Sequence, residues 1–207
     1  MITETKENLK ATKMIGNYTM LYSGVSQKTR AQPGVALITD QKWTSRITNY
    51  SFVNDRIITV RLKANRGHIA IIAVYAPEEG REEETRRFYK QLQKEDGKCN
   101  KNGSLIISGD LNARVGNQPI PNVVGTFGGR LRGQKWTDIK RICIFQRFQN
   151  CQHFFFKKNE IHKYTWSARG SKTVIDNIIV NRRPKNLVQD IKIFRGSDIG
   201  SDHFLVT

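Results

Sequence analysis

The sequence has few acidic residues, few cysteines and no long apolar run. Its 207 residues include 18 Asp and Glu against 35 Lys and Arg, a formal net charge of +17. The cysteines, Cys99, Cys143 and Cys151, are odd in number and form no CxxC pair. We therefore expect neither a disulfide framework nor a cysteine zinc site, and a reducing compartment fits this pattern.

Membrane and secreted classes are also disfavoured. The longest apolar run, Ile69–Ala76, is far shorter than the roughly 20 residues that a membrane-spanning helix needs. The N-terminal residues MITETKENLK lack the apolar segment of a signal peptide. There is no repeat, low-complexity tract or Pro/Gly-rich linker, so we predict a single domain over residues 1–207 with no membrane partner.

The strong positive charge indicates which binding partners to expect. A sequence pI near 10.1 favours polyanions, because a surface of one sign repels itself and attracts phosphate backbones. A basic protein that is merely soluble is the alternative. Nucleic acid is the better interpretation of this composition.

Short runs rich in Ile and Val dominate the chain, each bounded by Gly, Asn, Asp or Pro, which is typical of strands. The first forty residues contain no strong opening strand. The runs are Gly34–Thr39, Arg56–Leu62, His68–Tyr75, Ser104–Ser108, Val174–Val180 and Phe204–Val206.

Two helices are expected among these strands. Glu79–Lys94 begins with acidic residues and ends with lysines, which suits the helix dipole, and Asp138–Phe148 has an apolar face. Many strands with few helices predict an α+β fold, a two-layer β-sandwich flanked by helices.

The segment Leu105–Gly116, LIISGDLNARVG, is the first with chemical significance. An apolar strand leads into Asp110 and Asn112, and side chains two apart on a strand point the same way. A carboxylate can hold a divalent cation or accept a proton, while an amide orients a phosphate. An ordinary Asx turn is the alternative.

The segment Gly196–Val206, GSDIGSDHFLV, places an acid next to a titratable imidazole. Asp202 precedes His203, and Asp176 from the run VIDNIIV is a second available carboxylate. A carboxylate on one imidazole nitrogen fixes the tautomer and raises the basicity of the other. The remaining histidines are interpreted as structural.

A basic hairpin is predicted within Lys163–Val180, KYTWSARGSKTVIDNIIV. Arg169 and Lys172 lie in its loop, and Tyr164 and Trp166 lie at its base. Such a tip can contact phosphates and a nucleic-acid groove. A solvated turn is the alternative.

The ordered set GDLNAR, YAP at Tyr75–Pro77, TW, the strand Asp and the terminal SDH resembles the endonuclease/exonuclease/phosphatase superfamily, which includes deoxyribonuclease I and the apurinic/apyrimidinic endonucleases. Within it, the run HKYTWSARGSKTVID…SDIGSDHFLV is most similar to endonuclease domains of non-LTR retrotransposons of the RTE/BovB type, including craniofacial development protein 2-like sequences. The likeness extends from Thr3 to Val206.

The resemblance implies roles for individual residues. The segment ITETK makes Glu4 a ligand of Mg²⁺, with Mn²⁺ as a substitute, and Asp202 a further metal-side or orienting carboxylate. Catalytic roles fall on Tyr75, Asp110, Asn112, Asp176, Asp202 and His203, and contacts with nucleic acid on Arg114, Thr165, Trp166, Arg169 and Lys172.

The implied activity is Mg²⁺-dependent nicking of DNA that leaves a 3′-hydroxyl for priming. Water attacks phosphorus, and either Asp110 or His203 accepts its proton. Glu4, Asp110, Asp202 and His203 are then expected to converge. A monomer that acts in the nucleus follows, with a reverse transcriptase domain as partner if the chain is part of a longer polyprotein.

Departures from the family pattern leave alternatives open. Glu4 lies so near the first residue that the family's opening strand, with its active-site Asn, is absent, which predicts an N-terminally truncated domain. Asn177 replaces a usual Tyr. The alternatives are a catalytically impaired nucleic-acid-binding remnant, a phosphatase of the same superfamily, or a structural RNA binder, which would leave GDLN and SDH unexplained.

Overall fold

The chain divides into two compact units, Met1–Asp110 and Leu111–Thr207, and each is described by itself. A computed structural model describes residues 1–5, 7–25, 33–99, 103–114, 116, 118–121, 123–125, 148–150, 163–181, 188–196 and 200–207. The expected helix Asp138–Phe148 lies outside these residues except for Phe148, which begins a strand. The expectation of a single domain stays a prediction.

The first unit begins with an antiparallel sheet that the sequence did not fully reveal. Its order is β1-β4-β3-β2, with β1 Ile2–Thr3, β2 Lys10–Ile15, β3 Tyr18–Gly24 and β4 Gly34–Asp40. The expectation of no strong strand before β4 is therefore wrong. The edge strand β2, KATKMI, mixes polar and apolar residues, and β3 contains neither Ile nor Val, so neither has the apolar run of a buried strand.

The second sheet of this unit contains the expected Ile- and Val-rich strands. Its strands β5 Ile47–Asn54, β6 Ile57–Lys63, β7 His68–Tyr75 and β8 Ser104–Asp110 are neighbours in that order. β7 and β8 are parallel, whereas β5–β6 and β6–β7 are antiparallel. A parallel pair requires a crossover, and the crossover contains α2, Glu82–Gly97.

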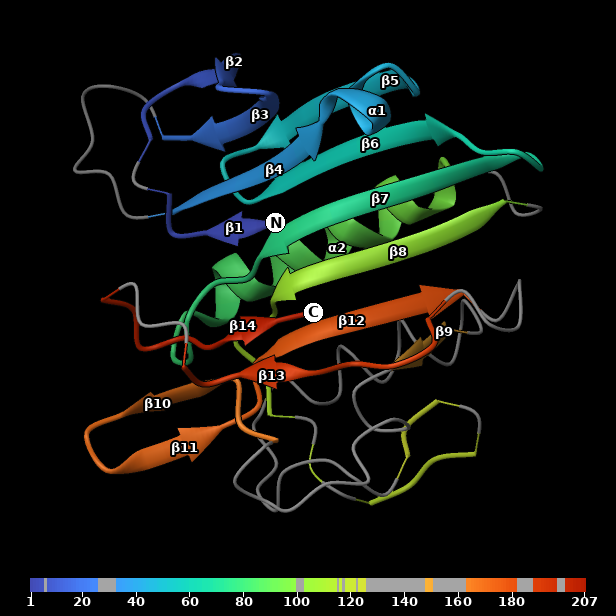
Figure 1. The fold of residues 1–207 in the computed structure, drawn as a ribbon. Coiled ribbons are helices and arrows are strands. Elements are labelled where there is room, and N and C mark those ends of the chain that lie inside the picture. The colour runs from blue at the N-terminus through green and yellow to red at the C-terminus, as the bar shows by residue number, and fades with distance from the viewer. Residues whose placement is uncertain are drawn as a thin grey trace. The chain divides into compact units, whose positions relative to one another are not determined.

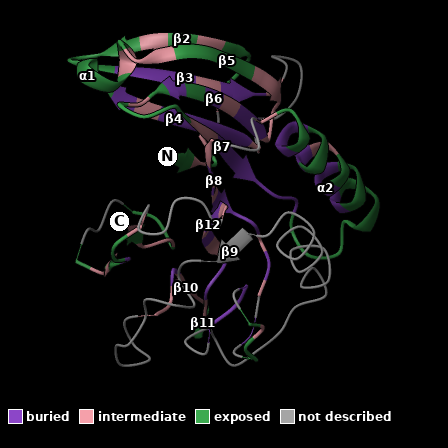
Figure 2. Ribbon diagram, turned by 90° about the vertical axis from the view of Figure 1, so that its right-hand side faces the viewer, coloured by how far each residue is buried: buried purple, intermediate pink, exposed green. Residues whose placement is uncertain are grey.

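The core of the unit lies between these two sheets. Hydrophobic side chains of both meet there in one cluster of Leu21, Val35, Leu37, Ile58, Val60, Leu62, Ala73 and Tyr75. Figure 1 shows the first sheet in front of the second, and Figure 2 shows the same layers from the side, with buried residues in purple. The predicted α+β sandwich flanked by a helix is confirmed.

Helix α2 lies on the face of the second sheet that is turned away from the first (Figures 1 and 2). It begins at Glu82 rather than at the expected Glu79, because Gly80 has a φ of 89°, which a right-handed helix cannot include. Phe88 and Leu92 are buried as expected. A one-turn helix, α1, spans Gln41–Thr44. None of the described helices is long and apolar enough to cross a membrane.

Within the second unit, the described strands form short antiparallel pairs. β12 Asp176–Asn181 pairs with β9 Phe148–Asn150, and β13 Ile193–Phe194 pairs with β14 Leu205–Val206. The predicted hairpin is present as β10 Trp166–Ala168 and β11 Ser171–Thr173. Positive φ angles at Arg169 (50°) and Gly170 (75°) are typical of a two-residue type I′ turn.

Gly109 is required by the close approach of β7 and β8. Its φ is 147°, and a Cβ atom there would lie 1.9 Å from the carbonyl oxygen of Val74. We expect Gly109→Ala to lower the free energy of unfolding by more than about 3 kcal/mol, because the clash involves backbone. Chemical denaturation measures this loss.

Gly80→Ala is the matched control, because Gly80 also has a positive φ but a Cβ there would meet nothing within 4 Å. It should cost only about 1 kcal/mol of backbone strain. Equal losses for the two variants would contradict the role assigned to close packing.

Asp96 predicts a pH dependence of stability. The side chain is buried, and its Oδ2 has no hydrogen-bond partner among the described residues. Burial raises the pKa of Asp96 to about 6, against about 3.9 in an unfolded chain. The folded state therefore binds this proton more tightly, and stability falls as the pH rises from about 4 through 6.

We expect Asp96→Asn to raise the free energy of unfolding near pH 8 by on the order of 2–3 kcal/mol and to change it little near pH 4. Thermal unfolding across this pH range is the measurement. The exposed Glu79 supplies a control, Glu79→Gln, which should show no such trend. The same gain for Asp96→Asn at both ends of the range would sink the assignment.

Candidate functional site

The ends of β7 and β8 bring two of the predicted site residues together in the first unit. In the parallel register Tyr75 is paired with Asp110, and the amide of Ala76 donates to the Asp110 carbonyl oxygen at 2.8 Å. The carboxyl ends of parallel strands share one edge of a sheet, where α/β proteins place their ligand sites. Both side chains are largely buried, with Tyr75 5% and Asp110 1% exposed.

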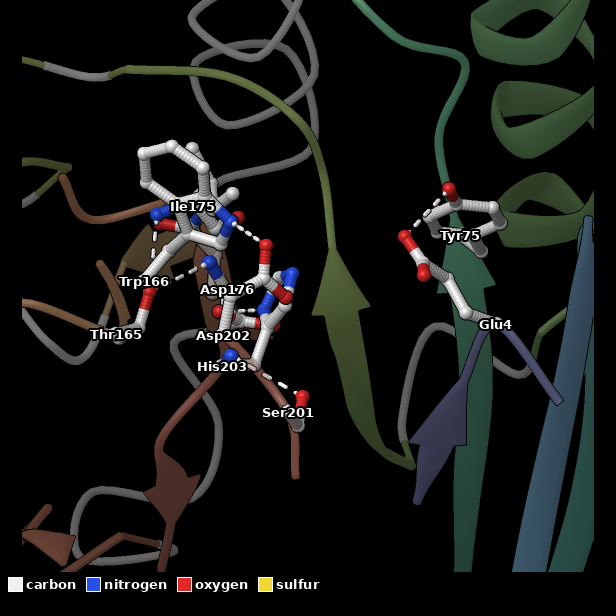
Figure 3. Close-up of polar contacts among 10 residues, drawn as sticks. Glu4, Tyr75, Thr165, Trp166, Ile175, Asp176, Ser201, Asp202 and His203 are labelled. Carbon is white, nitrogen blue, oxygen red and sulfur yellow. Dashed lines mark hydrogen bonds and ion pairs between the residues drawn. The ribbon is translucent and has the colours of Figure 1, made fainter. Parts of the chain in front are cut away.

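Glu4 joins this pair from the residues that follow β1. The Tyr75 hydroxyl donates a hydrogen bond to Glu4 Oε1 at 2.9 Å, and Figure 3 shows the two side chains pointing toward one another. Burial, reinforced by the negative charge of Glu4, raises the pKa of Tyr75. The phenol therefore stays protonated at neutral pH and acts as a hydrogen-bond donor.

Glu4 and Asp110 together form an oxygen-rich group. A carboxylate oxygen of each lies within 4.8 Å of one of the other. Two hard oxygen donors at this spacing suit Mg²⁺ or Mn²⁺ better than a softer metal, so the residues present fit a divalent cation. Glu4 is exposed and has a φ of 53°, a left-handed conformation that is uncommon outside glycine and concentrates at functional sites.

Asn112 reaches its position differently from the sequence prediction. The strand ends at Asp110, and Asn112 lies two residues beyond it with a φ of 45°. Alternation along a strand therefore does not orient its side chain. The left-handed conformation suits Asn, which tolerates it better than most residues.

The second unit contains an imidazole paired with a carboxylate. His203 Nδ1 lies 3.0 Å from Asp176 Oδ2, and each side chain is about one-fifth exposed, at 19% and 18%. A carboxylate on Nδ1 fixes the tautomer and the orientation of the imidazole ring. The Ser201 hydroxyl accepts from the His203 backbone amide at 3.1 Å (Figure 3).

Trp166 holds the carboxylate beside this histidine. Its indole Nε1–H donates to Asp202 Oδ2 at 2.7 Å (Figure 3), and the amide of Ser167 donates to the Asp202 carbonyl oxygen at 2.9 Å. The sequence prediction assigns Trp166 to nucleic acid. The observed contact gives this side chain a second task, the orientation of Asp202.

Thr165 is the site residue for which the structure argues against the sequence prediction. Its side chain is completely buried, and its hydroxyl accepts from the amides of Ile175 at 3.1 Å and Asp176 at 3.2 Å. Burial argues against direct contact with nucleic acid. Thr165 instead fixes the backbone from which Asp176 reaches His203. Asn177 follows Asp176, and its side-chain amide donates to the Ile175 carbonyl oxygen at 2.7 Å.

The predicted nucleic-acid contacts of the basic residues stay predictions. Arg169 and Lys172 are exposed on the hairpin, and Arg114 is partly buried. Sequence reasoning missed Ser201 and also Arg56, whose guanidinium lies over the Tyr75 ring. No sequence motif marks either residue. The one signal for Arg56 is the Asn-Asp turn before it, which places it at the start of a buried strand.

Comparisons with known proteins agree on the fold. No family model matches the chain. "Craniofacial development protein 2" of Bos taurus is 34% identical over 183 residues, 87% of this chain and 31% of that protein. The endonuclease domain of TRAS1, a telomere-specific non-LTR retrotransposon, superposes with a TM-score of 0.67 at 13% identity, covering 92% of this chain and 76% of that one.

An AP endonuclease from Archaeoglobus fulgidus has the same arrangement, with a TM-score of 0.64, 18% identity, and 92% and 78% of the two chains covered. The chain has the endonuclease/exonuclease/phosphatase fold. The resemblance that the motifs indicate is thereby confirmed. The chain spans about a third of the length of the curated relatives it matches.

Thr165 gives a direct test of how the second group is held. We expect Thr165→Val to accelerate amide hydrogen exchange at Ile175 and Asp176 by at least tenfold, because both amides lose their acceptor. Thr165→Ser keeps the hydroxyl and should preserve their protection. Exchange followed by NMR is the measurement, and equal protection in the Val and Ser variants would show that the hydroxyl does not order this backbone.

Proposed function

We propose that the chain is a Mg²⁺-dependent endonuclease that nicks DNA by hydrolysing a phosphodiester, in the manner of a retrotransposon endonuclease domain. The observation that carries the proposal is the group of Glu4, Tyr75 and Asp110 at the ends of β1, β7 and β8. Endonucleases among the solved structures with this fold support the reaction class.

The residues proposed to hold the cation are Glu4 and Asp202, and the spacing of carboxylate oxygens adds Asp110. When bound, a divalent cation stabilises the negative charge that develops on the phosphoryl oxygens. Oxygen ligands favour Mg²⁺, with Mn²⁺ as a substitute.

The protein's own side chains then have complementary tasks. The neutral Tyr75 hydroxyl is a donor that can serve a phosphate oxygen, and Asn112 orients the same phosphate. His203, held through Nδ1 by Asp176, exchanges a proton at Nε2, and either His203 or Asp110 accepts the proton of the attacking water. The proposal is that both groups act in one hydrolysis.

Substrate choice rests on charge. The net charge of +17 and the exposed Arg169 and Lys172 favour a long polyanion over a single phosphorylated headgroup. Binding should therefore weaken steeply with salt. With DNA as substrate, we propose that the protein acts in the nucleus, as a monomer or joined to a reverse transcriptase domain in a longer polyprotein.

Supercoiled-plasmid relaxation by the purified chain tests the activity. We expect nicking with Mg²⁺, none with EDTA, and a loss of about 10²–10⁴ in rate for Asp110→Ala and for His203→Ala. Glu79→Gln is the control. It removes one exposed carboxylate outside both groups of site residues and should nick as the unmodified chain does.

Each contrary outcome points to a different function or mechanism for this chain. DNA retention without nicking by a folded chain would support a nucleic-acid-binding remnant. Hydrolysis of a small phosphomonoester faster than plasmid nicking would identify a phosphatase-type member of the superfamily. Nicking that persists in both variants would remove Asp110 and His203 from the reaction.

A further inference from the structure

Arg56 contacts Tyr75 in three ways. Its guanidinium carbon lies 5.2 Å from the centroid of the Tyr75 ring, and its Nη1 donates to the Tyr75 carbonyl oxygen at 3.4 Å. In return the Tyr75 amide donates to the Arg56 carbonyl oxygen at 3.0 Å. The arginine therefore holds both the ring and the backbone of one residue.

The Arg56 side chain is itself held in place. Only 12% of it is exposed, and its Nη2 lies 3.8 Å from Glu84 Oε2 on α2. The Asn54 side chain accepts from the Arg56 amide at 2.9 Å, which fixes the start of β6. A cation with so little exposure is costly to bury unless its contacts compensate, so this arrangement points to a role beyond solubility.

We propose that Arg56 is a positioning residue that fixes the ring of Tyr75 so that its hydroxyl reaches Glu4. The cation on the ring face opposes swinging of the whole ring about the Cα–Cβ bond, the motion that would carry the hydroxyl away, since a guanidinium attracts the face of an aromatic and not its edge. The catalytic part of this inference rests on the proposed endonuclease function.

Arginine is required rather than positive charge alone. A lysine at this position has the charge but lacks the planar group that stacks on a ring while donating to a carbonyl. Arg56→Lys should therefore fold and yet hold Tyr75 less well, and Arg56→Met removes the charge and keeps an apolar chain of similar length.

Arg81 offers a matched control. Its Nη1 lies 3.4 Å from the same Glu84 oxygen, and its side chain is 46% exposed. Arg81→Met removes one partner of Glu84, as Arg56→Met does, but no contact with Tyr75 is among its described interactions. Effects that come only from the attachment of α2 should be the same in both variants.

The first readout does not depend on activity. The chain carries six tyrosines, and labelling their Cζ atoms with ¹³C gives one NMR signal each, with that of Tyr75 identified by its loss in Tyr75→Phe. We expect the Tyr75 signal to shift by more than its linewidth in Arg56→Met and Arg56→Lys and to stay in place in Arg81→Met. An unmoved signal in Arg56→Met, or an equal shift in Arg81→Met, would overturn the proposal.

The second readout is a double-mutant cycle on plasmid nicking. We expect Arg56→Met to lower kcat at least tenfold with little change in KM, and to have less than a twofold effect when Tyr75→Phe is already present, because the hydroxyl it positions is gone. A full tenfold loss in both backgrounds would mean that Arg56 acts on the fold alone. If the unmodified chain does not nick at all, the proposed function fails, and the NMR signal still decides the role of Arg56.

Discussion

The parallel pairing of β7 with β8 is the interaction on which the rest of the first unit's site depends. Its register sets Tyr75 opposite Asp110, and it is possible only because Gly109 lets the β8 backbone approach the Val74 carbonyl. β1, paired with β4, delivers Glu4 to the Tyr75 hydroxyl. One backbone constraint thus assembles a carboxylate pair and a neutral phenol, a set that can hold a cation and donate to a phosphate.

Much of this arrangement follows from the sequence. β7 was predicted with its observed bounds because a short run of Ile, Ala and Val, ended by a Tyr-Ala-Pro segment, is typical of a buried strand. The strand before Asp110 and the hairpin around Arg169 were also correctly located, since buried runs and Arg-Gly turns depend on local chemistry. The two-layer α+β fold then follows from many strands and few helices.

Other features depend on contacts that a linear pattern does not encode. β2 and β3 escaped because an edge strand and its neighbour need no Ile- or Val-rich run. The family resemblance assigned Thr165 to nucleic-acid contact, yet its buried hydroxyl accepts from two backbone amides. Arg56 carries no motif, and its significance arises only where the folded chain sets it on the Tyr75 ring.

In the proposed function, water attacks the phosphorus of a DNA phosphodiester and the 3′-oxygen leaves. Nicking in ¹⁸O-labelled water, followed by mass analysis of the cut ends and polymerase extension from the nick, tests it most directly. The account predicts one labelled oxygen in the 5′-phosphate and a 3′-hydroxyl that a polymerase extends. Unlabelled phosphate, or a nick that ends in a 3′-phosphate, would contradict it.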